Sequence, residues 1–301
     1  MRPTLVVIVG PTAVGKTEIG VRLAEHFSSE IISADSRQMY KELKTGTALP
    51  SPEQLARVKH HFIGNLSIHD YYNVSMFEQD VLALLSSLFP EKPVIFMVGG
   101  STLYINAVFH GIDDLPSVDQ ELRDELQQQY KENGIEFLRN KLKILDPEYY
   151  QRVDLKNPNR LLKAIEISLM TGKPYSSLLT APSRERDFRI IKIGLNKNRE
   201  ELFEQINKRV DEMFDKGLPD EAKLLFPYKN LNSLNTVGYK ELFLCEEGKV
   251  SMDQAKEQIK TNTRKYAKRQ LTWFKRDGDI HWFEPDHTNE ILEFLKKELD
   301  E

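Results

Sequence analysis

Residues 10–17 place the tightest limit on how this chain can fold. They fit the pattern G-x-x-x-x-G-K-[ST] and are Gly10, Pro11, Thr12, Ala13, Val14, Gly15, Lys16 and Thr17. An apolar, β-branched run from Leu5 to Val9 precedes them, and Ile19, Leu23 and Phe27 follow at helical spacing. The sequence therefore predicts a strand, a phosphate-binding loop and a helix, in that order.

The chemistry of this loop suits a diphosphate or triphosphate group. Its glycines let backbone amides turn toward phosphate oxygens, and the start of the following helix adds positive potential. Lys16 supplies a fixed positive charge, and Thr17 supplies a hydroxyl that can ligate a metal ion. We expect Lys16 and Thr17 to serve catalysis, with Mg²⁺ as the cofactor held at Thr17.

Three more strands are predicted beyond the loop. Ile31 and Ile32 begin a short strand that ends at Asp35, 94–98 is an apolar run, and 190–195 is a further strand candidate. Helical patterns separate the strands, which is typical of a parallel sheet with ligands at the carboxyl ends of its strands. The expected fold is α/β, with a P-loop NTPase-like core built on a parallel sheet.

The strand signals disappear in the middle of the chain. Charged helical patterns such as 120–130 and 159–170 replace them. We therefore predict a helical insertion domain over residues 113–189. The core domain then consists of residues 1–112 and 190–301, with a basic helical region near its C-terminal end.

Charge is distributed unevenly along the 301 residues. The net charge is −4, yet residues 254–276 hold eight Lys or Arg residues against one Glu. Lys256, Lys260, Arg264 and Lys268 recur at four-residue spacing and share one helical stripe. Such a stripe can follow a nucleic-acid backbone. A solvated helix face would show the same spacing, so both interpretations stay open.

Several classes of protein are excluded. The single cysteine, Cys245, permits no internal disulfide and no cysteine-based zinc cluster. The apolar runs fall far short of the roughly 20 residues that span a bilayer, and the N-terminus lacks a secretory pattern. We expect a cytoplasmic monomer with no membrane partner.

Asp35 is the only acidic residue at a predicted strand end near the loop, because 94–98 runs into Gly99 and Gly100. Three roles are open for its carboxylate. It can associate with a metal ion, act as a general base on a nucleophile beside the phosphates, or cap a helix over 36–40.

Further short motifs run through nearly the whole chain. They are Ser33 to Gln38 with Tyr40, Gly46 to Ala48, His60-His61, Gly99-Gly100, Leu115-Pro116, Leu145 to Glu148, Thr171 to Pro174, Gly238 to Glu241 and Thr263 to Trp273. Together with residues 10–17, they resemble the motifs of the bacterial tRNA dimethylallyltransferases, also called tRNA isopentenyltransferases. The resemblance implies a loop that holds dimethylallyl diphosphate and does not hydrolyse ATP.

The resemblance also implies an acceptor and roles for individual residues. The acceptor in the family is the exocyclic amine of the adenosine just 3′ of the tRNA anticodon, so the anticodon stem-loop is the expected partner. Asp35 matches the family's base, and Arg209 matches an Arg near the diphosphate. The residues expected to contact tRNA are Asp35, Ser36, Arg37, Gln38, Ser101, Arg123, Asn159, Arg160, Leu161, Leu162, Lys163, Arg264, Lys268 and Arg269.

This reaction is chemically coherent. An allylic diphosphate ionises when its leaving group is stabilised, and a carboxylate can take the proton of a weakly nucleophilic adenine amine. A P-loop small-molecule kinase or an adenylate prenyltransferase would use the same loop without needing the basic stripe. A non-catalytic RNA-binding module would explain the stripe but not Lys16, Thr17 and Asp35 together.

Overall fold

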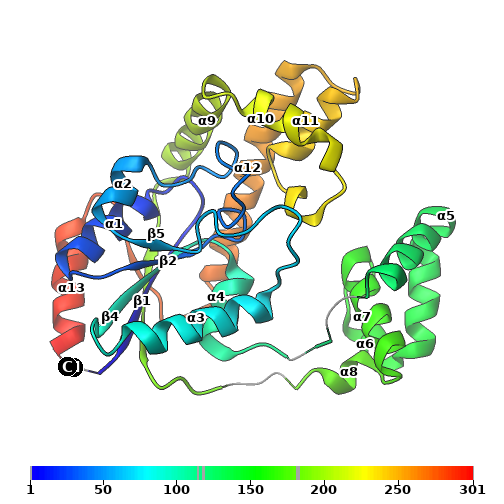
Figure 1. Cartoon of the computed structure of the whole chain (residues 1–301), viewed down its shortest axis with the longest axis horizontal. Coiled ribbons are helices and arrows are strands. Elements are labelled where there is room, and N and C mark those ends of the chain that lie inside the picture. The colour runs from blue at the N-terminus through cyan, green and yellow to red at the C-terminus, as the bar shows by residue number, and fades with distance from the viewer. Residues whose placement is uncertain (1, 114, 117–118, 181–183, 301) are drawn as a thin grey trace. The chain divides into compact units, whose positions relative to one another are not determined.

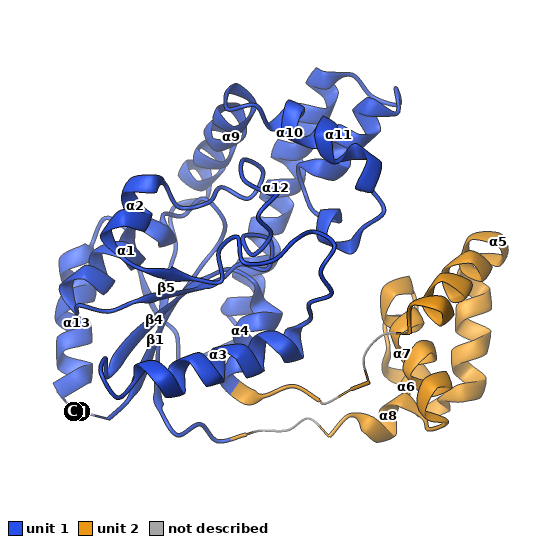
Figure 2. Ribbon diagram, viewed as in Figure 1, with its two compact units in different colours: residues 1–109, 185–301 blue, residues 110–184 orange. Residues whose placement is uncertain are grey.

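A computed structural model describes residues 2–113, 115–116, 119–180 and 184–300. The chain divides into two compact units, Met1–Phe109 with Glu185–Glu301, and His110–Arg184 (Figure 2). The division falls within a few residues of the boundaries expected at 113 and 189.

The first unit is built on a six-stranded parallel sheet. The strand order is β3-β2-β4-β1-β5-β6. The strands are β1 Thr4–Val9, β2 Ile31–Ala34, β3 His60–His61, β4 Val94–Gly99, β5 Arg189–Leu195 and β6 His281–Phe283. The parallel sheet and the four predicted strands are confirmed, whereas β3 and β6 were not predicted because two or three residues give little periodic signal.

Helices cover both faces of this sheet (Figure 1). On one face, Val6 and Ile8 of β1 share a core with α1 (Lys16–His26), α9 (Arg199–Asp215) and α13 (Thr288–Asp300). On the other, Leu5 and Val7 share a core with α3 (Val74–Leu88) and α4 (Thr102–His110). Alternate residues of β1 thus face opposite layers, so the strand is apolar from Leu5 to Val9.

A group of helices lies beyond the carboxyl ends of the strands. It consists of α10 (Leu218–Leu225), two 3-10 turns (Phe226–Tyr228 and Asn232–Leu234), α11 (Tyr239–Glu246) and the long α12 (Met252–Phe274). These elements enclose a third core around Tyr239, Leu43 and Ile259. The short α2 (Pro52–Arg57) follows a capping box at Ser51. Together with α9, α12 lies close to the edge of the sheet (Figure 1).

The regular elements described in the second unit are all helices. It contains α5 (Gln120–Leu145), α6 (Pro147–Arg152), α7 (Pro158–Thr171) and α8 (Tyr175–Leu178) around a core of its own. Gly134 breaks α5 with a φ of 71°, a backbone conformation that glycine adopts most readily. The buried Asp146 caps α6 and accepts two hydrogen bonds from Ser176, which fixes α8. Across the described parts of both units, no helix has the length and apolar character to cross a membrane.

Candidate active site

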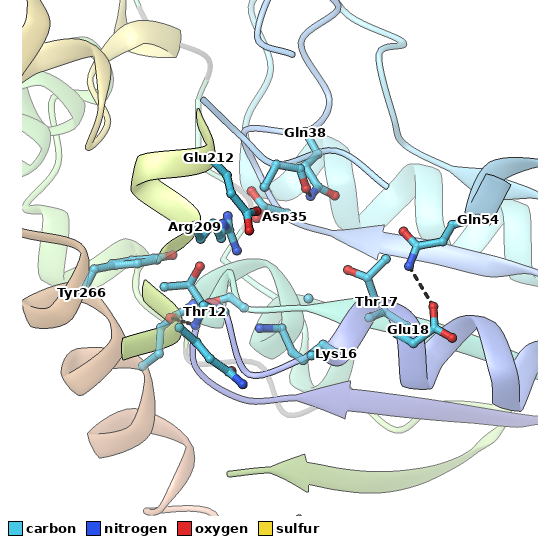
Figure 3. A pocket seen from close by; sticks show the side chains of 18 of the residues that line it. Thr12, Lys16, Thr17, Glu18, Asp35, Gln38, Gln54, Arg209, Glu212 and Tyr266 are labelled. Carbon is cyan, nitrogen blue, oxygen red and sulfur yellow. Dashed lines mark hydrogen bonds between the residues drawn. The ribbon is translucent and has the colours of Figure 1, made fainter. Parts of the chain in front are cut away.

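A cavity of about 410 Å³ lies at the carboxyl ends of β1, β2 and β4. The loop after β1, Asp35 after β2 and Gly99-Gly100 at the end of β4 line its sheet side. Arg209 of α9 and Tyr266 of α12 line its helical side (Figure 3). Side chains that the sequence placed in separate motifs therefore meet in one site.

The loop after β1 has the backbone that phosphate binding requires. Gly10, Ala13 and Gly15 have φ values of 149°, 66° and 101°. A Cβ on Gly10 would lie 2.4 Å from the carbonyl oxygen of Leu195, so β5 leaves room only for glycine there. The loop is therefore fixed between β1, β5 and the start of α1.

Lys16 lies across this loop. Its Nζ donates hydrogen bonds to the carbonyl oxygens of Gly10 at 3.1 Å and Pro11 at 2.7 Å. Burial and, to a smaller extent, the positive charge of Arg209 lower the pKa of Lys16 to about 7, although the nearby Asp35 acts to raise it. Thr17 follows at the start of α1 and also lines the cavity.

Affinity for inorganic diphosphate should depend on pH through Lys16. A bound anion favours the charged amine and raises its pKa, so binding is strongest below pH 7 and weakens as the pH rises through about 7. Calorimetry with diphosphate and Mg²⁺ at a pH above 7, in buffers of different ionisation enthalpy, should detect net proton uptake. Lys16→Arg, which stays charged, is the control: equal proton uptake by both proteins would contradict the assignment.

Asp35 stands at the end of β2, partly enclosed beside Arg209 (Figure 3). Its Oδ1 accepts a hydrogen bond from the backbone N–H of Arg37 at 3.0 Å. Residues 36–39 form turns rather than a helix, so the helix-capping interpretation is wrong. The short polar side chain instead stabilises a tight turn, which the sequence pattern cannot distinguish from a cap.

The residues after Asp35 hold this turn in place. Ser101 Oγ accepts the N–H of Ser36 at 2.9 Å. Arg37 donates to the carbonyl oxygens of Asn232 and Ser233, and Gln38 donates to those of Thr47 and Ala48. The side chains of Arg37, Gln38 and Ser101, which the resemblance places on the tRNA side, therefore form hydrogen bonds within the protein.

A second cavity of about 340 Å³ adjoins the first. Both are lined by Thr12, Ala13, Asp35, Arg209 and Tyr266. The second also has apolar side chains, Ile206, Val210, Met213, Val237 and Ile259. Asp35 and Arg209 therefore stand between the side lined by Lys16 and Thr17 and a more apolar side.

Three of the four cations of the basic stripe on α12 make polar contacts with α9. Lys256 and Lys260 form ion pairs with Asp211 of α9 at 2.8 and 3.0 Å, and Arg264 donates to Asn207 at 2.5 Å. Lys268 is exposed, with its Nζ 5.5 Å from the centroid of the Phe203 ring. Lys256, Lys260 and Arg264 therefore hold α12 against α9, so the stripe is not a uniformly solvated face. Contact of its exposed member, Lys268, with a phosphate backbone stays a prediction.

A neighbouring face of α12 is exposed instead. It carries Lys265, Tyr266, Arg269 and Trp273. The guanidinium of Arg269 lies 5.8 Å from the centroid of the Tyr266 ring, and both side chains line the second cavity. Of the three α12 residues expected to contact tRNA, Arg269 lines the second cavity.

The expected tRNA contacts of the insertion belong to the second unit. Arg123 pairs with the buried Glu166 at 2.8 Å. Asn159 and Arg160 are exposed at the start of α7, and Lys163 is half-buried. Leu161 is fully buried in the core of this unit, and Leu162 packs against that core. The expected contact through the Leu161 side chain is therefore wrong: helical periodicity turns it away from solvent.

Comparison with known proteins decides the family. The family model for IPP transferases matches residues 38–277. The chain belongs to the IPP transferase family. The tRNA dimethylallyltransferase 1 of Bacteroides thetaiotaomicron is 52% identical over 98% of this chain and 96% of its own length. The tRNA dimethylallyltransferase of Christiangramia forsetii is 50% identical over 98% of both chains.

Solved structures of IPP transferases share the fold. The tRNA isopentenylpyrophosphate transferase of Bacillus halodurans has a TM-score of 0.72 and 34% identity, covering 99% of this chain and 97% of that one. A eukaryotic dimethylallyltransferase acting on tRNA has a TM-score of 0.76 and 25% identity, covering 93% and 73%.

Sequence reasoning missed several residues that line the first cavity of this IPP transferase. Gln54 and Glu212 gave no pattern that distinguishes them from surface residues. Gln270 lies inside the motif from Thr263 to Trp273, so the resemblance could have identified it.

Proposed function

We propose that this protein transfers a dimethylallyl group from dimethylallyl diphosphate to the N6 amine of the adenosine 3′-adjacent to the tRNA anticodon. The observation that carries the proposal is that Lys16, Arg209 and Asp35 line the same cavity. Two cations for a leaving diphosphate and one carboxylate for a proton are what this transfer needs.

The leaving group is stabilised on the loop side. The bond between the allylic carbon and the diphosphate oxygen breaks as the charge on that oxygen grows. Lys16 and Arg209 line the cavity with Ala13, Gly15 and Thr17, and we expect both cations and the backbone N–H groups of these loop residues to stabilise this growing charge. Lys16 donates to loop carbonyl oxygens in the free protein, and we expect it to exchange these partners for phosphate oxygens.

The nucleophile approaches from the side of Asp35. The new bond joins the allylic carbon to N6 of adenine, and the displaced N6 proton passes to the Asp35 carboxylate. Such proton transfer typically contributes about 10²–10⁴-fold. The adenine must leave its stack to reach this depth, and the second cavity leads to Asp35 past Tyr266 and Arg269.

The site suits Mg²⁺ as cofactor. Among the described residues no group of three or more His, Cys, Asp or Glu side chains could hold a metal ion by itself. Mg²⁺ commonly uses one or two protein ligands and completes its shell with phosphate oxygens and water, so the Thr17 hydroxyl at the cavity wall fits it. When bound, the ion would neutralise charge on the diphosphate.

tRNA is the proposed partner, bound by the exposed face of α12 and by the insertion through Arg123, Asn159, Arg160 and Lys163. Lys268 remains a candidate at the edge of that face. We propose that the protein works as a monomer in the cytoplasm, where its tRNA substrate is found.

Substrate choice tests this function against a kinase or an adenylate prenyltransferase. The purified protein is incubated with Mg²⁺ and either dimethylallyl diphosphate or ATP, in the presence of unmodified tRNA or AMP. We expect prenylation of tRNA from dimethylallyl diphosphate and no phosphate transfer from ATP. Prenylation of AMP alone, or ATP-dependent phosphorylation, would contradict the proposal.

Arg269→Ala should weaken tRNA binding and flatten its salt dependence. One lost phosphate contact reduces the slope of log K against log salt by about one unit. Lys256→Ala is the matched control on the same helix, because Lys256 is paired with Asp211. Fluorescence titrations across salt concentrations measure both slopes. A slope that falls for Lys256→Ala but not for Arg269→Ala would reverse the assignment of the two faces.

A further inference from the structure

Gln270 is a buried polar residue that the proposed chemistry leaves without a role. Its side chain lies on α12 and the residue is 4% exposed. Gln270 Oε1 accepts the backbone N–H of Thr12 at 2.8 Å, and Nε2 donates to the carbonyl oxygen of Gly100 at 2.9 Å. Because one partner is only a donor and the other only an acceptor, a single orientation of the amide satisfies both.

The protein packs closely around the side-chain amide of Gln270. A Cβ on Gly100 would lie 2.2 Å from Gln270 Nε2, so a side chain there would displace it. Thr12 and Gly100 are backbone groups of two separate loops, one after β1 and one at the end of β4. The Gln270 amide therefore connects two loops that the sheet alone leaves unlinked at this point.

These loops carry the two halves of the proposed chemistry. Thr12 belongs to the loop that holds Lys16. Gly100 precedes Ser101, whose Oγ accepts the N–H of Ser36, the residue after Asp35. Gln270 thus fixes the loop of residues 10–17, here called the diphosphate loop, relative to the turn that carries Asp35. It lies on α12, the helix that exposes Tyr266 and Arg269.

We propose that Gln270 is a positioning residue that holds the diphosphate loop and Asp35 in the relative position that transfer requires. This inference rests on the proposed function. Gln270 acts through the Thr12 N–H and the Gly100 carbonyl, not on the reacting atoms. A displacement of about 1 Å between reacting groups can cost about a hundredfold in rate, so two hydrogen bonds at this junction suffice for a large effect.

The first test replaces the amide with a side chain of similar length. Gln270→Met removes both hydrogen bonds, and the single-turnover rate constant at saturating dimethylallyl diphosphate should fall about 10- to 100-fold. tRNA affinity should stay unchanged, because the residue is buried. With folded enzyme still in excess over tRNA and saturating, a misfolded fraction leaves the rate constant unchanged, so a lower rate constant reports on the folded variant. Gln258→Met, on the same helix, is the control and should react at the wild-type rate.

The second test uses a variant that can be restored. In Gln270→Glu the carboxylate still accepts from Thr12 but cannot donate to Gly100, whereas the protonated acid does both. The rate of this variant relative to wild type should therefore rise as the pH falls, while that of Gln270→Met stays flat. A wild-type rate constant for Gln270→Met, or a relative rate of Gln270→Glu that does not change with pH, overturns the inference. Absence of transfer by the wild-type protein would instead overturn the proposed function.

Discussion

Lys16→Ala is expected to reduce dimethylallyl transfer at least about a thousandfold while leaving tRNA affinity unchanged. Removing one preorganised donor from a developing negative charge typically costs about 10²–10³-fold, and Lys16 adds a full positive charge to that effect. The residue belongs to the loop after β1 and lines the cavity, and it is not part of the exposed face of α12. Rapid-quench assays measure the transfer, and filter binding measures tRNA affinity.

Two controls make the Lys16 result specific. Lys223→Ala removes an exposed lysine on α10 and should change neither quantity. Lys16→Arg keeps the charge but alters its shape, so it should retain part of the activity. A loss of tRNA binding that equals the loss of transfer would show that Lys16 belongs to the RNA interface, against the present assignment.

Asp35→Asn is expected to lower the single-turnover rate by at least about a hundredfold, with little change in affinity for diphosphate or tRNA. The amide keeps the size of the side chain and can still accept the N–H of Arg37, but it cannot take a proton. The turn around Asp35 should therefore survive, and the melting temperature with it.

A metal-associated role for Asp35 predicts a different pattern. Diphosphate binding would then weaken at low Mg²⁺, and excess Mg²⁺ would restore activity. Measuring diphosphate affinity and rate across Mg²⁺ concentrations separates the two roles. Asp215→Asn, at the exposed end of the helix that carries Arg209, is the control for loss of a carboxylate.

Local patterns account for the part of the structure that the sequence predicted. Each predicted strand contains β-branched apolar residues, and β1 and β4 are buried on both faces along their whole length. The motif at 10–17 fixes the turn that follows β1. Because parallel strands end at one edge, Asp35 could be placed near Lys16 before any coordinates were known.

The orientation of helices could not be predicted in the same way. Four-residue spacing groups Lys256, Lys260, Arg264 and Lys268 on one face of α12, but it does not say that Asp211 and Asn207 of α9 lie opposite. Leu161 was misplaced for a related reason: a matching motif names a position without saying which neighbours enclose it. Gln270 forms hydrogen bonds with Thr12 and Gly100, which precede it by 258 and 170 positions in the sequence. Local periodicity does not reveal contacts at such separations.

The most direct test of the central claim is nucleoside analysis of unmodified tRNA after incubation with this protein, Mg²⁺ and dimethylallyl diphosphate. Enzymatic digestion followed by mass spectrometry locates the modified base. The account predicts one N6-dimethylallyl adenosine, immediately 3′ of the anticodon, formed by the wild-type protein and at a rate at least about a hundredfold lower by Asp35→Asn. Transfer to another nucleoside, no transfer by the wild-type protein, or an equal rate for Asp35→Asn would contradict it.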